Sequence, residues 1–116
     1  MAQSKRNRVS KTARDRIAQL KQQLCEFDLV CTGTLAKRTK VCGKAGCRCA
    51  QDPQARHGPY YEWGCMREGK QVRRMVSPEQ AKLLRKAIAN YRTIRRLLRD
   101  WEAQTLRLME TEKRSR

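Results

Sequence analysis

The sequence is poor in aromatic side chains and in acidic side chains. Its 116 residues include one Phe, two Trp and three Tyr, and 11 Asp and Glu stand against 28 Lys and Arg. The acidic residues are scattered, so no pair of carboxylates is placed for general acid–base catalysis. No glycine-rich phosphate loop precedes a helix either. We therefore expect a protein that is not an enzyme and that has no small-molecule substrate.

Long apolar runs are also missing. No stretch approaches the ~18 apolar residues that span a bilayer, and no apolar segment follows the basic start of the chain, so no secretory signal is predicted. We expect a cytoplasmic protein with no membrane partner. In a reducing cytoplasm, six cysteines more often bind metal than form disulfides. A disulfide framework stays open only for a chain exported by another route.

Positive charge is what the chain has in excess, with a formal net charge of +17. Such an imbalance predicts attraction to a polyanion, nucleic acid first and a membrane surface as the weaker alternative. Few acidic neighbours compensate the basic residues, which favours a phosphate-binding surface over a merely solvated one. A base-stacking role for Tyr60 or Tyr61 stays open. The residues predicted to contact nucleic acid are Lys37, Arg38, Lys40, Lys44, Arg48, Arg56, Arg73, Arg74, Arg85, Arg92 and Arg96.

Three cysteines and the single histidine form one cluster with the spacing Cys42-x4-Cys47-x-Cys49-x7-His57. Three thiolates and one imidazole make a tetrahedral set of ligands that suits zinc. Because all four ligands would come from the protein, the zinc would have no open coordination position. The expected cofactor is therefore a structural zinc ion.

Alternatives to this ligand set stay open. The cysteines could form a cluster of thiols without metal, or supply a redox-active or nucleophilic thiol. Cys31 or Cys65 could also replace His57 as the fourth ligand. A histidine alone is usually structural, and His57 gains its interest only from the neighbouring cysteines.

Periodicity predicts an α+β fold in one domain over 10–116. Residues 1–9 are basic and are predicted to form a disordered arm. Apolar residues recur at steps of three and four from Ala13 to Phe27, which predicts a helix over 10–27. A β-favouring stretch, the cysteine loop and a hairpin then predict a small antiparallel sheet over 29–76.

The hairpin is predicted around a turn at Glu68-Gly69. A two-residue turn there pairs Arg67 with Lys70 and, further along, Trp63 with Arg74. Arg74 is then placed to stack on Trp63, which we interpret as a core residue. The predicted inner face carries Tyr61, Trp63, Cys65, Val72 and Val76.

A long helix is predicted over 78–113. Ser77 is suited to cap it, Pro78 to open its first turn and Gln80 to complete a capping box. Apolar residues at alternating steps of three and four then predict a coiled-coil seam. The first helix is shorter, so we expect the distal seam to contact a second copy or another protein. The residues predicted for that contact are Tyr91, Ile94, Leu98, Trp101 and Leu108.

The cysteine motif also resembles a known family. The matching positions are Cys42, Gly43, Lys44, Gly46, Cys47, Cys49, His57, Gly58, Pro59 and Tyr60. They resemble a family of small uncharacterised prokaryotic proteins with a domain of unknown function, and the likeness extends over roughly Gly33 to Leu98. The resemblance implies no reaction. Members of that family occur near transposable elements, which implies a DNA-linked role and favours DNA over RNA.

The hypothesis from the sequence is a non-enzymatic, zinc-stabilised basic protein that binds nucleic acid. It would act as an oligomer or as an accessory subunit of a larger DNA-acting machine. The alternative is a protein–protein adaptor that acts through its long amphipathic helix, and a thiol-dependent enzyme is a minor alternative. No base specificity is implied, because the sequence has neither a helix-turn-helix nor a standard zinc finger.

Overall fold

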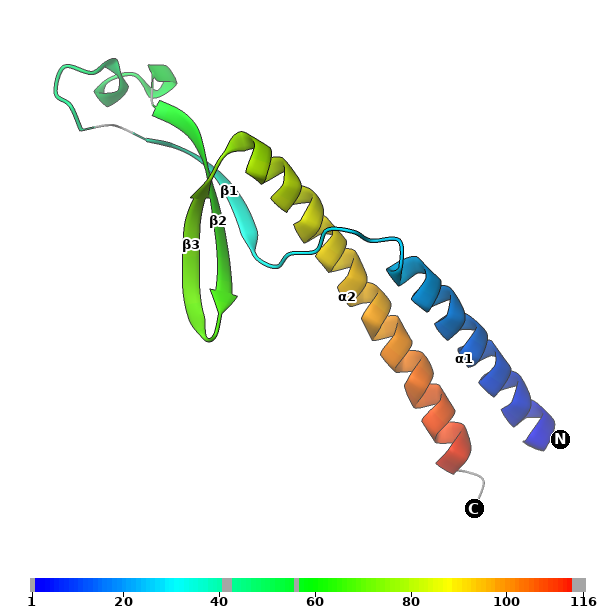
Figure 1. The fold of residues 1–116 in the computed structure, drawn as a ribbon. Helices are drawn as coiled ribbons and strands as arrows, with labels where there is room; N and C mark the ends of the chain where they lie inside the picture. The colour runs from blue at the N-terminus through cyan, green and yellow to red at the C-terminus, as the bar shows by residue number, and fades with distance from the viewer. Residues whose placement is uncertain (1, 41–42, 56, 114–116) are drawn as a thin grey trace. The chain divides into compact units, whose positions relative to one another are not determined.

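A computed structural model describes residues 2–40, 43–55 and 57–113 (Figure 1). Within these ranges it describes the backbone, but not the side chains, of residues 2–4, 40, 49, 53, 57 and 113. The predicted α+β class is confirmed: an N-terminal helix, a three-stranded antiparallel sheet and a long C-terminal helix. The elements are α1 (Ala2–Leu24), β1 (Thr34–Lys40), the 3-10 helices η1 (Arg48–Ala50) and η2 (Pro53–Ala55), β2 (His57–Arg67), β3 (Lys70–Val76) and α2 (Pro78–Lys113).

The chain divides into two compact units. A helical unit is formed by Met1–Asp28 together with Asn90–Arg116, and a sheet unit by Leu29–Ala89. Helix α2 begins in the sheet unit and ends in the helical unit. A single helix therefore contributes side chains to two separate cores.

In the helical unit, α1 runs antiparallel beside the C-terminal part of α2 (Figure 1). Ala13 and Leu20 of α1 are fully buried. A run of half-buried side chains on α2 recurs at steps of four and three, the spacing of a coiled-coil seam. That seam consists of Asn90, Ile94, Leu97, Trp101, Gln104, Leu108 and Thr111.

The start of the chain differs from the prediction. Helix α1 begins at Ala2 and ends at Leu24, so the arm predicted to be disordered over 1–9 is helical from Ala2 onward. The stripe of side chains around the buried Ala13 continues upstream to Val9, which is half-buried. Since Lys and Arg are good helix formers, the basic residues before Val9 extend the helix rather than end it.

The observed seam on α2 also differs from the predicted one. Leu98 was expected in the seam and is 48% exposed, whereas its neighbour Leu97 is half-buried. The observed seam includes the polar residues Asn90, Gln104 and Thr111, which a search for apolar residues passes over. At Leu98 the predicted seam therefore lies beside the half-buried face of the helix and not on it.

The sheet has the strand order β1-β2-β3, and both neighbouring pairs are antiparallel. The hairpin register is confirmed, with Arg67 opposite Lys70 and Trp63 opposite Arg74. At the Glu68–Gly69 turn the φ angles are 51° and 77°. Positive φ at both central residues gives the turn type whose twist matches that of the flanking strands.

The core of the sheet unit lies between one face of the sheet and the first turns of α2. The indole Nε1–H of Trp63 donates a hydrogen bond to the Thr32 carbonyl at 2.9 Å, and the Cys31 amide donates to the Ala87 carbonyl at 3.2 Å. These bonds tie the segment before β1 to the hairpin and to α2. The buried apolar residues of this unit are Cys65, Ala81, Ala87 and Ile88.

Candidate nucleic-acid interface

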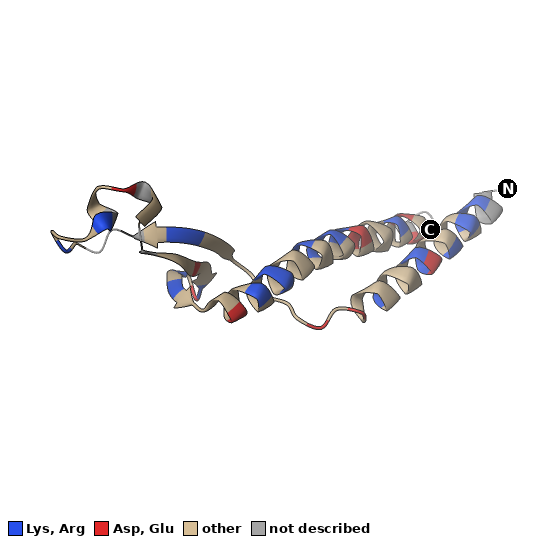
Figure 2. Cartoon of the chain, turned by 90° about the horizontal axis from the view of Figure 1, so that it is seen from above, with Lys and Arg blue, Asp and Glu red and all other residues tan. Residues whose placement is uncertain are grey.

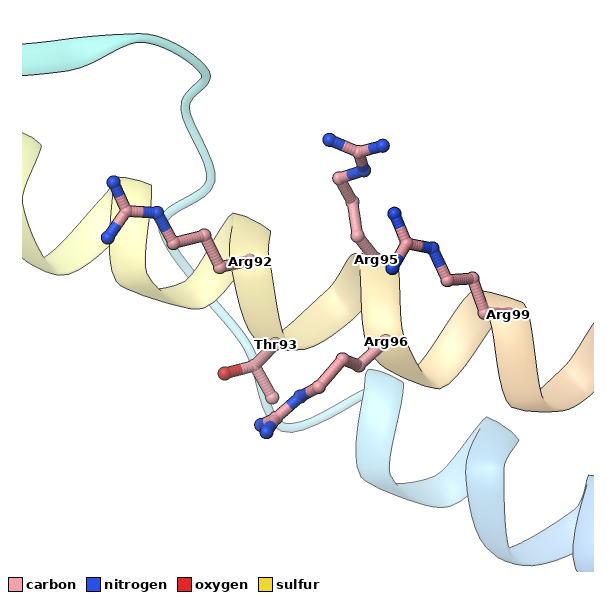
Figure 3. A pocket seen from close by; sticks show the side chains of 5 residues that line it. All are labelled: Arg92, Thr93, Arg95, Arg96 and Arg99. Atoms are coloured by element: carbon pink, nitrogen blue, oxygen red, sulfur yellow. The ribbon is translucent and has the colours of Figure 1, made fainter.

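Four arginines line a shallow groove of about 420 Å³ on α2 together with one threonine (Figure 3). The lining residues are Arg92, Thr93, Arg95, Arg96 and Arg99. The arginines stand at i, i+3, i+4 and i+7, so at ~100° per residue they fall within an arc of ~100° on the helix. In Figure 3 the side chains of Arg92, Arg96 and Arg99 lean toward the N-terminal end of the helix, the direction in which helical Cβ atoms point. We call these four residues the groove arginines.

The groove arginines lie on the opposite side of α2 from its half-buried seam. All four are exposed, whereas Ile94, Leu97 and Trp101 are half-buried. At ~100° per residue, the centres of the two sets are roughly 180° apart around the helix. Packing of α1 on the seam therefore leaves the groove arginines accessible to a ligand.

Acidic side chains do not neutralise this groove within the part of the chain that the structure describes. Figure 2 shows Lys and Arg recurring along α1 and α2, with acidic positions fewer. Arg95 lies over the ring of Tyr91, with its Cζ atom 5.9 Å from the ring centroid, a cation–π contact that leaves its charge in place. The ion pairs among the described residues are Arg16–Asp100, Arg38–Glu62 and Arg48–Asp52.

Asp100 stands four residues after Arg96 but is engaged elsewhere. Its carboxylate accepts hydrogen bonds from Gln104 at 3.0 Å and from Arg16 at 2.7 Å. These two hydrogen bonds, that of Gln104 first, lower the pKa of Asp100. The carboxylate charge is therefore committed to the contact between α1 and α2.

The predicted set includes Arg92 and Arg96 but omits Thr93, Arg95 and Arg99, which line the same groove. Arg95 and Arg99 complete the i, i+3, i+4, i+7 pattern that begins at Arg92. A search for charged residues at helical spacing would have found them. The threonine follows no pattern in the sequence and is located by the structure alone.

The predicted basic residues of the sheet are not gathered into one patch. Lys37 and Arg38 are neighbours on β1, and Arg73 and Arg74 are neighbours on β3. Because consecutive side chains of a strand leave opposite faces, each pair is split between the two faces of the sheet. Arg38 is also held by Glu62, with a nitrogen–oxygen distance of 3.6 Å.

The remaining predicted basic residues are dispersed. Arg48 pairs with Asp52 at 3.3 Å in the cysteine loop. Arg56 lies outside the described residues, as does the side chain of Lys40. Two further predicted residues, Lys44 and Arg85, are exposed.

The sheet closes the base of the cysteine loop. Lys40 at the end of β1 is the strand partner of His57 at the start of β2, so the loop leaves and re-enters the sheet at one point. Gly43 turns the chain with a φ of 81°. Cys47 then precedes η1, and its amide donates to the Lys44 carbonyl at 3.2 Å.

Of the four predicted zinc ligands, the structure describes only the Cys47 side chain, which is half-buried. Cys42 lies outside the described residues, as do the side chains of Cys49 and His57. No group of three metal-ligating side chains occurs among those that are described. The zinc site therefore stays a prediction from the donor set.

Cys31 and Cys65, the two cysteines that could replace His57 as the fourth ligand, are too far from the cysteine loop. Cys65 is 5% exposed in the core and stands eight residues along β2 from His57, or ~26 Å at ~3.3 Å per residue. Cys31 precedes Thr34, whose strand partner is Gly64, and thus belongs to the same distant end of the sheet. Since zinc–sulfur distances are about 2.3 Å, neither cysteine can join a site at the loop.

Comparison with known proteins places residues 10–86 within a family model described as "Domain of unknown function (DUF6788)". No curated protein matches the chain, and no solved structure matches it. Neither helix is long and apolar enough, within the residues that the structure describes, to cross a membrane.

Proposed function

The chain belongs to the DUF6788 family, whose description assigns no activity, and we propose that it is a non-enzymatic protein that binds nucleic acid through the groove arginines. The observation that carries this proposal is four exposed arginines on one face of α2 with no acidic ion-pair partner among the described residues. The net charge of +17 adds attraction at longer range.

The chemistry of this groove suits phosphate. A guanidinium group presents a planar fork of donors that binds phosphate oxygens in pairs, and the Thr93 hydroxyl adds another donor. From Arg92 to Arg99 the helix rises ~10 Å. Duplex DNA carries one charge per ~1.7 Å of its axis. The groove arginines can therefore contact several phosphates of one nucleic acid at once.

Structural zinc is part of the proposal. Cys42, Cys47, Cys49 and His57 would hold it and keep the basic loop around Lys44 in shape. A closed set of protein ligands supplies folding energy and no reaction. DNA is the proposed ligand rather than RNA, as the family resemblance implies.

A second candidate function is a protein–protein contact through α2. Three large apolar residues of its distal part are about half exposed: Leu98 at 48%, Leu106 at 49% and Met109 at 53%. Exposed apolar residues repeated along one helix support contact with a second copy or another protein. Such a contact would make the chain an oligomer or an accessory subunit, and it is compatible with nucleic-acid binding.

Binding to a duplex of about 20 base pairs, measured by fluorescence anisotropy between about 50 and 200 mM salt, tests the main proposal. The informative variant is Arg92→Gln with Arg96→Gln. The matched control is Lys11→Gln with Arg14→Gln, which removes two exposed charges from α1. Log affinity falls as log salt rises, and each lost phosphate contact makes this negative slope less steep by about 0.9. We expect the groove variant to reduce the steepness by about 1.8 and the control to reduce it by less. A flat slope for the unmodified protein contradicts the proposal and favours the adaptor.

A further inference from the structure

A second groove, of about 240 Å³, lies in the sheet unit between the inner sheet face and the first turns of α2. The surface that its lining residues present to the groove is almost wholly apolar, and Leu83 on its helix side is 59% exposed. The lining residues are Trp63, Arg74 and Val76 from the sheet and Gln80, Leu83 and Leu84 from α2.

The aromatic wall of this groove is fixed in place. The Trp63 indole donates to the Thr32 carbonyl at 2.9 Å, and Trp63 stands opposite Arg74 in the strand register. Gln80 is also held, because its side-chain Oε1 accepts a hydrogen bond from the Ser77 amide at 2.8 Å. A ligand would therefore meet a preformed surface and would lose little affinity to ordering it.

We propose that this groove holds one unpaired nucleobase, stacked on Trp63. This inference rests on the proposed function, because it names the form of nucleic acid that the same protein binds. Aromatic rings and arginine guanidinium planes are the surfaces on which unpaired bases stack. Trp63 supplies an aromatic ring at this groove, and Arg74 lines the groove beside it.

Charge favours a nucleotide over an apolar protein segment as the occupant. Arg74 is exposed and has no ion-pair partner among the described residues. A nucleotide brings an apolar base face together with the phosphate that this guanidinium can bind. A paired base within a duplex has both faces covered by its neighbours, so it cannot enter. The groove therefore selects single-stranded nucleic acid, or a duplex with an extruded base.

The test compares Leu83→Glu with Met66→Glu. Met66 is a matched control, since it is 61% exposed against 59% for Leu83, belongs to the same unit and stands on the other face of the sheet from Trp63. The probes are oligothymidylate of about 20 nucleotides and a duplex of the same length. We expect Leu83→Glu to weaken single-strand binding about tenfold or more relative to Met66→Glu. Duplex binding should be the same for the two variants.

A fluorescence measurement gives an independent readout. The chain has two tryptophans, so Trp101→Phe leaves Trp63 as the only indole. Saturation with oligothymidylate should quench Trp63 fluorescence, and the duplex should not. Unchanged Trp63 fluorescence overturns the base site, as does an equal effect of the two glutamate variants on single-strand binding. Steep salt-dependent duplex binding would then leave the proposed function standing, whereas no binding to either probe ends both.

Discussion

The carboxylate of Asp100 accepts two hydrogen bonds from Arg16, from Nη2 at 2.7 Å and from Nε at 2.9 Å. Both hydrogen bonds go to the same oxygen, Oδ2. Because Arg16 is on α1 and Asp100 on α2, this pair joins the two helices. Gln104 donates a further hydrogen bond to Asp100 at 3.0 Å. The hydrogen bonds from Gln104 and Arg16 lower the pKa of Asp100 from its ordinary 3.8.

The first prediction is that acid weakens the helical unit. A carboxyl whose pKa is lowered in the folded state stabilises the fold above its unfolded pKa and loses that contribution as the pH falls through the folded pKa. The pH range over which Asp100 loses its stabilising contribution therefore lies below pH 3.8. Thermal unfolding followed by circular dichroism from about pH 5 to about pH 2 measures it. Across this pH range, the melting temperature of the unmodified protein should fall further than that of the Asp100→Asn variant.

The control for that measurement is Asp15→Asn, which removes an exposed carboxylate from α1. It should retain the acid sensitivity of the unmodified protein. Equal acid sensitivity in Asp100→Asn and the unmodified protein would show that the Arg16–Asp100 pair does not link protonation to folding.

The second prediction concerns Gly33, which comes immediately before β1. Its φ is +111°, and a Cβ atom there would lie 2.7 Å from Trp63 Nε1 and closer still to the Gly64 carbonyl oxygen. Gly33→Ala therefore combines backbone strain with two clashes, and we expect it to lower the free energy of unfolding by about 2 kcal/mol or more. Urea denaturation measures this loss. At Gly46 a Cβ would meet nothing within 4 Å, so Gly46→Ala should unfold at the same urea concentration as the unmodified protein.

The third prediction concerns the metal. Purified protein should hold about one zinc ion per chain, and a chelator should lower its melting temperature, because binding energy at a structural zinc site is folding energy. Cys49→Ser should lose the zinc. Cys31→Ser should keep it, because Cys31 belongs to the distant end of the sheet. Zinc retained in Cys49→Ser, or lost in Cys31→Ser, would reject the proposed ligand set.

The fourth prediction concerns assembly. If distal α2 forms a protein contact between copies, Leu98→Glu with Met109→Glu should lower the mass measured by light scattering toward that of one chain, 13.6 kDa. Leu83→Glu is the control, since Leu83 is similarly exposed but belongs to the sheet unit. A monomer mass for the unmodified protein would leave α2 to contact a different protein, and pull-down with the same variants would then test that contact.

Local patterns predicted much of the fold because their causes are local. The turn at Glu68-Gly69 and the period of two in the strands fix the hairpin register, with Trp63 opposite Arg74. Ser77 and Gln80 exchange the two hydrogen bonds of a capping box, at 3.1 and 2.8 Å. They start α2, and with no Gly or Pro beyond its first residue to stop it, the helix continues to Lys113 as predicted.

The seam of α2 was harder to predict because part of it is polar. Gln104 is half-buried and donates a hydrogen bond to Asp100, which in turn pairs with Arg16 on the other helix. The prediction of a disordered arm before Ser10 is wrong for a related reason. Its helix depends on packing that continues to Val9, and composition alone made the segment look like a solvated tail.

The sequence by itself determined the α+β class, the hairpin register, the long helix and the excess of positive charge. Each follows from residues close together in the chain or from composition. Only the tertiary structure decided which arginines share a groove, which cysteines stand too far away to join the predicted zinc site, and which α2 residues face α1. Those three depend on which surfaces pack together and which stay open, because packing brings together residues that are distant in the chain.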